Sequence, residues 1–209
     1  MKKDLSIVTV NLLYTFLALE LALYPLNSKQ YFILEYYFFI HKIFLKEFFV
    51  MARNLMEPKR ENRINLDQLK NKLIEDKNIF TLTISDEIDD ELVKCLIELE
   101  NKKEFQKYIK DFGSYIDRIR NLKEFIKVKE IRMLIAHSDK CSFQKKLLNF
   151  DDLNKLEEML IDIGLKLTEL KYKLNAKTSL EIDNIYSFSK TYAKNFWETL
   201  IAGYNLLNK

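Results

Sequence analysis

Long stretches without glycine or proline dominate the first quarter of the chain. The stretch 5–24 is almost wholly apolar and stops at Pro25, and the stretch 30–56 is rich in aromatic residues and meets no breaker before Pro58. Proline lacks a backbone donor and clashes with the preceding helical turn, so a helix is expected to end at each of these positions. The pattern therefore predicts two long helices within the first 56 residues.

The most regular spacing of apolar residues lies in the last third of the chain. Asp151 or Asp152 is predicted as the N-cap of this helix. Its apolar seam has strict three-four spacing: Leu153, Leu156, Leu160, Ile163, Leu167, Leu170 and Leu174. Such a seam suits packing inside one subunit and also a two-chain coiled coil. A last helix is predicted over 180–207, with Ile185, Phe188, Tyr192, Phe196, Trp197 and Leu200 as its apolar residues.

The middle of the chain is less regular. A charged loop is followed by a short helical pattern from Ile64 to Ile74, a β-prone run at 79–85 and an acidic run at 86–91 that suits a helix N-terminus. These features predict a peripheral insertion over 57–112. Gly113 is predicted to separate this insertion from a helix over 114–137.

Together these patterns predict an all-α protein. The expected architecture is an up-and-down helical bundle of about five long helices with a peripheral insertion, in a single domain covering 1–209. Only three glycines and two prolines are available for turns, which disfavours a β fold with many turns.

Charge and cysteine usage narrow the class of protein only slightly. The net charge of +3 does not by itself predict nucleic-acid binding. Cys95 and Cys141 match no zinc-ligand spacing, which predicts reduced thiols in a cytoplasmic protein. Asp4, Asn11 and Glu20 interrupt the apolar N-terminal stretch, so a buried helix is expected there and no membrane partner.

Candidate chemistry gathers in the segment EIRMLIAHSDK, residues 130–140, which places Arg132 and His137 in an apolar setting. No phosphate-loop, dinucleotide-binding, zinc-protease or serine-hydrolase motif is present in the sequence. An imidazole exchanges protons near neutral pH, and a guanidinium binds phosphate oxygens as a fork. This pair suits proton transfer and charge stabilisation at a phosphodiester, without a metal or a cofactor.

An Arg followed after four residues by His, at the end of a bundle helix, resembles the signature of the HEPN superfamily. The run Ala136-His137-Ser138-Asp139 is particularly similar to that group, and the segment 48–73 resembles its AbiU-type abortive-infection branch. The resemblance implies a metal-independent ribonuclease that acts in phage defence or as a toxin. It also implies an RNA substrate, a homodimer, and an antitoxin or phage protein as a further partner.

Two positions depart from that family pattern. Met133 stands where HEPN proteins commonly have a polar residue directly after the Arg, so a secondary contact to RNA or to the other motif residues is in doubt. Asp139 stands where some toxin-type members carry a Tyr that a partner nucleotidyltransferase modifies. The resemblance therefore does not extend to control by tyrosine modification.

The residues after the motif have two interpretations each. Asp139 either orients His137 or is simply solvated. Lys140, Lys145 and Lys146 either form a phosphate-attracting rim or are a hydrated cluster of charges.

The spacing of Arg132 and His137 makes a geometric demand. Five residues on an ideal helix separate two side chains by about 140° around the axis and about 7.5 Å along it. Either the helix ends or distorts before His137, or two subunits place their motifs face to face. The resemblance favours the second arrangement, so we predict a homodimer with this helix at its two-fold axis.

The same residues also allow a structural interpretation. Arg132 can lie over apolar neighbours with its charge in water, and His137 is a favourable residue at a helix C-terminus. A non-catalytic helical binding or sensor protein of a defence system is therefore the alternative function, and Met133 is the feature that motivates it. His41, in the aromatic helix, is interpreted as structural.

Overall fold

The computed structural model of the chain describes residues 2–27, 37–56, 64–75, 91–128, 130, 150–174 and 182–207. Every regular element within these ranges is a helix, so the predicted all-α class is confirmed for the described part of the chain. The elements are α1 Lys2–Leu23, a short 3-10 helix η1 Tyr24–Asn27, α2 Tyr37–Met56, α3 Leu66–Glu75, α4 Glu91–Arg120, α6 Phe150–Lys173 and α7 Ile182–Leu207.

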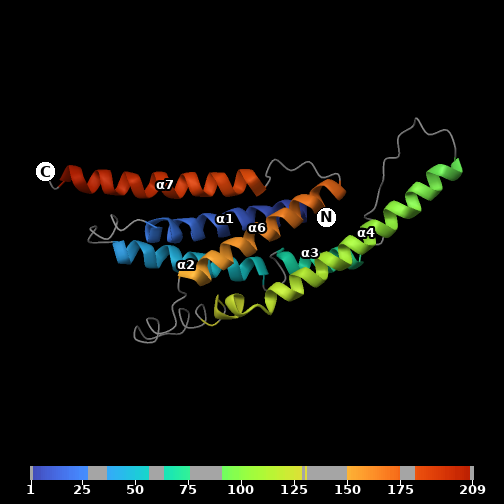
Figure 1. Cartoon of the computed structure of the whole chain (residues 1–209), viewed down its shortest axis with the longest axis horizontal. Coiled ribbons are helices and arrows are strands. Elements are labelled where there is room, and N and C mark those ends of the chain that lie inside the picture. The colour runs from blue at the N-terminus through green and yellow to red at the C-terminus, as the bar shows by residue number, and fades with distance from the viewer. Residues whose placement is uncertain are drawn as a thin grey trace.

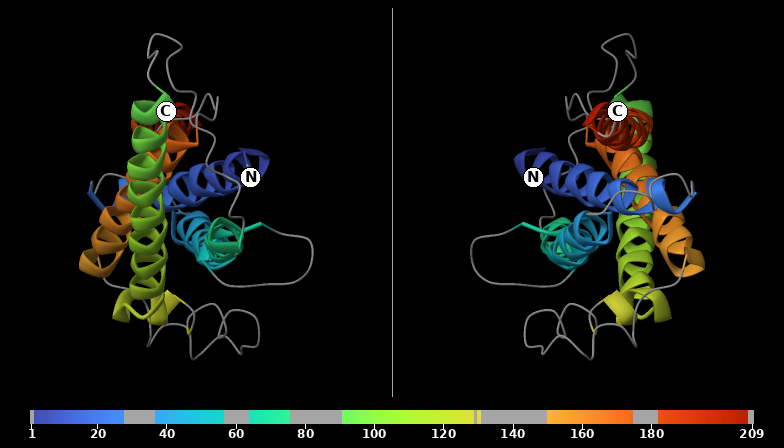
Figure 2. Two further views of the ribbon diagram at one scale, coloured as in Figure 1. Left: turned by 90° about the vertical axis from the view of Figure 1, so that its right-hand side faces the viewer. Right: turned by 90° about the vertical axis from the view of Figure 1, so that its left-hand side faces the viewer.

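Helix α1 is the centre of the arrangement. In Figure 1, α2 runs antiparallel to α1 on one side, and α7 lies along its other side. Helix α6 crosses these helices obliquely, and the N-terminal end of α4 projects beyond them. The two end-on views of Figure 2 show the same crossing, with α4 upright against the tilted α1 and α6. Because α1 packs against α2, α6 and α7, its apolar composition reflects burial on several sides.

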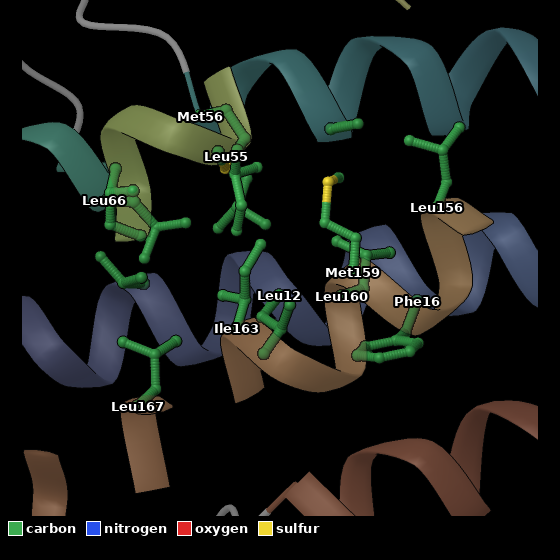
Figure 3. Close-up of a cluster of buried hydrophobic side chains, with 14 of the residues drawn as sticks. Leu12, Phe16, Leu55, Met56, Leu66, Leu156, Met159, Leu160, Ile163 and Leu167 are labelled. Atoms are coloured by element: carbon green, nitrogen blue, oxygen red, sulfur yellow. The ribbon is translucent and has the colours of Figure 1, made fainter. Parts of the chain in front are cut away.

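The predicted seam of α6 faces the core. All seven of its predicted apolar positions are buried in the same cluster as residues of α1 and α2. Figure 3 shows Leu12 and Phe16 of α1 beside Leu160 and Ile163 of α6. The seam therefore packs inside one chain, as the bundle interpretation requires. Helix α6 begins at Phe150, so Asp151 and Asp152 lie in its first turn. Their negative charges interact favourably there with the positive end of the helix dipole.

Side chains from two other helices satisfy the C-terminal carbonyls of α1. The indole nitrogen of the fully buried Trp197 donates to the Leu21 carbonyl at 2.8 Å, and His41 Nε2 donates to the Ala22 carbonyl at 3.0 Å. The last carbonyls of a helix have no partner within it, so these bonds fix its end to α7 and α2. Burial lowers the pKa of His41. This contact agrees with the structural interpretation of His41.

Helix α3 begins with a reciprocal cap. Asn65 Oδ1 accepts from the backbone nitrogen of Gln68 at 2.9 Å, and Gln68 Oε1 accepts from that of Asn65 at 3.3 Å. Further along, the buried Asp67 binds Lys70 Nζ at 3.2 Å and Arg120 Nη1 at 2.8 Å. Because Arg120 belongs to α4, these bonds tie the two helices together.

The described part of 57–112 packs into the common core. Its buried residues belong to the same cluster as α1, α2 and α6: Leu66, Leu69, Leu73, Phe105, Tyr108 and Phe112. This packing differs from the peripheral position expected for the insertion. The boundaries of the predicted insertion stay a prediction, and the β-prone run 79–85 lies outside the described residues.

The expected helix break at Gly113 is wrong. Gly113 lies inside α4, which continues to Arg120. A single interior glycine weakens a helix by about 1 kcal/mol, which tertiary packing readily offsets. The break instead falls at Asn121, whose backbone nitrogen donates to the Arg118 carbonyl at 3.1 Å while its side chain donates to the Asp117 carbonyl at 2.9 Å. A new helical stretch over 123–128 follows.

Helix α7 buries one face and exposes the other. Ile185 and Trp197 are buried, whereas Phe188 and Tyr192 are about half exposed and lie with their ring centres 6.0 Å apart. Among the described residues, one segment, Lys2–Leu26, is long and apolar enough to cross a membrane, and most of it is buried in the bundle. The predicted cytoplasmic location and absence of a membrane partner stay predictions.

Candidate functional site

The predicted catalytic motif falls between the described helices. All six candidate residues lie outside the described residues: Arg132, His137, Asp139, Lys140, Lys145 and Lys146. Their mutual geometry and the predicted contact between two subunits therefore stay predictions, and so does the effect of Met133. The described residues on either side of the segment 131–149 do show how its two ends are held.

Two ion pairs join the helical stretch before the segment to the helix after it. Lys127 Nζ lies 2.7 Å from Asp152 Oδ2, and Lys155 Nζ lies 3.5 Å from Glu124 Oε1. We call these two pairs the flank contacts. Lys127 is five residues before Arg132 in the sequence, and Asp152 is in the first turn of α6. The chain therefore enters and leaves the motif segment at neighbouring points.

Buried apolar side chains lie next to the flank contacts in the sequence, on both sides of the segment. Phe125 and Val128 on one side of the segment, and Leu153 and Leu156 on the other, are fully or almost fully buried in the common core. Each buried side chain of this size contributes roughly 1.5–3 kcal/mol by its removal from water. The described residues that flank the segment on either side therefore belong to the common core.

A second polar site, which sequence analysis missed, lies where α1, α6 and α7 meet. It consists of Glu20, Glu157, Tyr186 and Lys190, and we call it the acid junction. Tyr186 Oη donates to Glu157 Oε1 at 2.7 Å, and Lys190 Nζ lies 3.2 Å from the same oxygen. Lys190 Nζ also lies 4.3 Å from the centre of the Tyr186 ring. One carboxylate oxygen of Glu157 thus serves two donors of α7.

Glu20 is the unusual member of the acid junction. It is 4% exposed, and its Oε1 has no hydrogen-bond partner. Burial, together with the neighbouring Glu157, raises the pKa of Glu20 to about 8. The sequence signal for this site is a carboxylate among apolar residues in the last turn of a core helix, which from the sequence alone argues only against a membrane span.

Tyr186 and Lys190 keep their usual charge at neutral pH. Burial raises the pKa of Tyr186, and its hydrogen bond to Glu157 adds to this effect. Burial alone would lower the pKa of Lys190, but hydrogen bonds to Tyr186 and Glu157 raise it overall. Tyr186 is therefore neutral and Lys190 is cationic, and the acid junction holds one positive charge beside two carboxyl groups.

An open groove of about 530 Å³ lies along one face of α1. Its titratable lining residues are Lys3, Asp4 and Tyr14. Asp4 is already bound to Lys72 Nζ at 2.9 Å, which ties α1 to α3. None of these three side-chain types ordinarily titrates near neutral pH, so the groove lacks a group suited to general acid–base chemistry there.

Within the part of the chain that the structure describes, no group of three or more His, Cys, Asp or Glu side chains is arranged to hold a metal ion. Comparison with protein-family models, with curated proteins and with solved structures found no match to this chain. The resemblance to the HEPN superfamily therefore rests on the residues of segments 130–140 and 48–73.

Proposed function

We propose that this protein is a metal-independent endoribonuclease whose reacting groups are Arg132 and His137. The observation that carries the proposal is the Arg-x4-His segment with its Ala-His-Ser-Asp run, in an all-helical chain. The flank contacts support it, because they anchor both ends of the segment that bears these residues.

The proposed reaction is attack of a ribose 2′-oxygen on the adjacent phosphorus. The bond from phosphorus to the 5′-oxygen of the next nucleotide breaks, which leaves a 2′,3′-cyclic phosphate and a 5′-hydroxyl. His137 takes the proton of the 2′-hydroxyl as the new bond to phosphorus forms and returns a proton to the leaving 5′-oxygen, and Arg132 binds the phosphate oxygens as negative charge builds on them. Asp139 orients the imidazole in this proposal.

The substrate is RNA because the nucleophile is its own 2′-hydroxyl. Lys140, Lys145 and Lys146 follow the motif closely and add a positive rim that attracts the phosphate backbone. The site is proposed to be completed by a second copy of the chain, because five residues of straight helix would not direct both side chains to one phosphate. The resemblance suggests a role as an abortive-infection protein or toxin in the cytoplasm, with an antitoxin or phage protein as partner.

The test is cleavage of RNA by the purified full chain in EDTA. His137→Ala is expected to lower the rate at least about 100-fold, the usual contribution of a positioned acid–base group. Arg132→Lys keeps the charge but loses the fork, so a substantial loss is expected there too. Lys123→Ala, at an exposed position before the motif, is the matched control and should keep the wild-type rate. Equal cleavage by His137→Ala and wild type would contradict the proposal.

A non-catalytic binding protein is the second candidate function. The observation in its favour is the exposed aromatic pair Phe188 and Tyr192 on the outer face of α7. Growth arrest that survives combined substitution of Arg132 and His137, but is lost in a Phe188→Ser, Tyr192→Ser variant, would favour binding over cleavage. Loss of growth arrest with the first pair alone would favour the ribonuclease.

A further inference from the structure

The acid junction contains more negative groups than its surroundings can neutralise. Glu20 comes from the last turn of α1, Glu157 from α6, and Lys190 from α7. With both carboxyls ionised, this site would hold two negative charges and one positive charge. A buried charge without a counter-ion is costly, and the cost is avoided when one carboxyl keeps its proton.

The hydrogen bonds indicate where that proton lies. Both donors from α7, Tyr186 and Lys190, are directed at Glu157, which is therefore the better stabilised anion. Glu20 receives neither of them, and its Oε1 is buried without a partner. Two neighbouring carboxyl groups repel each other when both are ionised, and Glu20 is the one of the two that receives fewer hydrogen bonds.

We propose that Glu20 and Glu157 hold a single proton between them, and that its release weakens the packing of α1 against α6 and α7. The acid junction is in this account a proton-sensitive device built into the core of the bundle. It uses other residues than the proposed ribonuclease site and does not depend on that function.

Few titratable or charged side chains from the described helices that pack against α1 lie close to Glu20. Glu157 approaches from α6, and Lys190 and Tyr186 approach from α7. From α2, His41 bonds the carbonyl of Ala22 two residues further along, and burial favours its neutral form. The nearest counter-charge is thus Lys190, and it is already engaged by Glu157.

The direction of the pH dependence follows from the two states of Glu20. In the unfolded chain this carboxyl has its ordinary pKa of 4.5, and in the folded chain its pKa is about 8. The folded state therefore binds the proton more tightly. The stabilisation is fully present below pH 4.5 and is progressively lost as the pH rises through about 8.

The first experiment observes the proton in the unmodified protein. In protein labelled with ¹³C at the glutamate side-chain carboxyls, one resonance should titrate with a midpoint between about pH 7 and 9, well above the ordinary range for Glu. That resonance should disappear in Glu20→Gln. Titration of every glutamate carboxyl below pH 6 would overturn the proposal.

The second experiment measures thermal unfolding at two pH values. Glu20→Gln keeps the shape of the protonated acid but cannot ionise, so its Tm should be at most slightly above that of wild type at pH 5 and exceed it by about 4 °C or more at pH 8.5. Glu158→Gln removes a charge from the exposed neighbour of Glu157 on α6 and should follow the wild-type curve at both pH values. Equal Tm differences for Glu20→Gln at pH 5 and pH 8.5 would overturn the proposal even if the carboxyl resonance could not be assigned.

Discussion

Helix α6 takes part in two polar junctions that stabilise their carboxyl groups in different ways. In the flank contacts, Lys127 meets Asp152 and Lys155 meets Glu124, so each carboxylate has a cation from across the contact. At the acid junction, Glu157 of the same helix meets Glu20, and a proton takes the place of the missing cation. Opposite charges hold the ends of the motif segment, whereas shared protonation holds α1 to α6 and α7.

This difference has consequences for how each junction responds to conditions. An ion pair that is partly open to water weakens as salt rises, because mobile ions screen it. A buried pair of carboxyls responds to pH instead. The comparison therefore predicts that salt and pH act on different parts of the same bundle, and the following variants test that separation.

The largest effect on stability is expected at Gly164, where α6 packs closely against Ile182 at the start of α7. A Cβ added there would lie 2.0 Å from Cδ1 and 3.1 Å from Cβ of Ile182, so the Ile182 side chain must move away. Gly164→Ala should lower the free energy of unfolding by about 1–3 kcal/mol, despite the better helix propensity of alanine. Chemical denaturation measures this change.

Gly203→Ala is the matched control for that substitution. It lies in α7 with no atom within 4 Å of the added Cβ, so it should be neutral or raise the free energy of unfolding by up to about 1 kcal/mol. Equal destabilisation by the two substitutions would contradict the close packing of α6 on α7.

The next effect concerns the flank contacts. Lys127→Met keeps the apolar stem but removes the charge that faces the buried Asp152, and the free energy of unfolding should fall by about 1 kcal/mol at low salt. The difference from wild type should shrink in 1 M salt. If the motif segment is the ribonuclease site, this variant should also cut RNA more slowly than wild type, whereas Lys123→Met should not. A salt-independent difference would contradict the ion-pair account.

An effect on stability of similar size is expected from the hydroxyl of Tyr186. Tyr186→Phe removes the 2.7 Å bond to Glu157 and should cost about 0.5–1.5 kcal/mol at pH 7, measured by chemical denaturation. Because Glu157 then loses a donor to its anionic form, the shared proton should be held more tightly and the carboxyl midpoint should rise. Tyr192→Phe, at an exposed position of the same helix, should change neither quantity.

The sequence predicted the buried residues best where the apolar residues of a helix form a single regular stripe. The strict three-four spacing of α6 specified its buried seam from Leu153 to Leu174, and all seven positions are buried. The same reasoning did not separate the aromatic residues of α7, because spacing alone leaves the width of the buried face open. Trp197 is fully buried on α1, whereas Phe188 is half exposed.

Features that depend on contacts between helices were not predictable from local pattern. Gly113 resembled a boundary, but α4 continues through it because its neighbours pack into the core. Glu20 became a candidate proton site only when Glu157, 137 positions later in the chain, was placed beside it. For the proposed ribonuclease site the reverse holds, since Arg132 and His137 were identified by sequence and lie outside the described residues.

The central claim is that Arg132 and His137 promote attack by the 2′-hydroxyl of RNA. The most direct measurement uses an RNA oligonucleotide cleaved at a mapped bond, compared with the same oligonucleotide carrying one 2′-deoxy nucleotide on the 5′ side of that bond. In EDTA, the account predicts a 2′,3′-cyclic phosphate end from the all-RNA substrate and no cut at the substituted bond. Cleavage of the deoxy-substituted bond at the same rate would contradict it, because the nucleophile could not then be the 2′-hydroxyl.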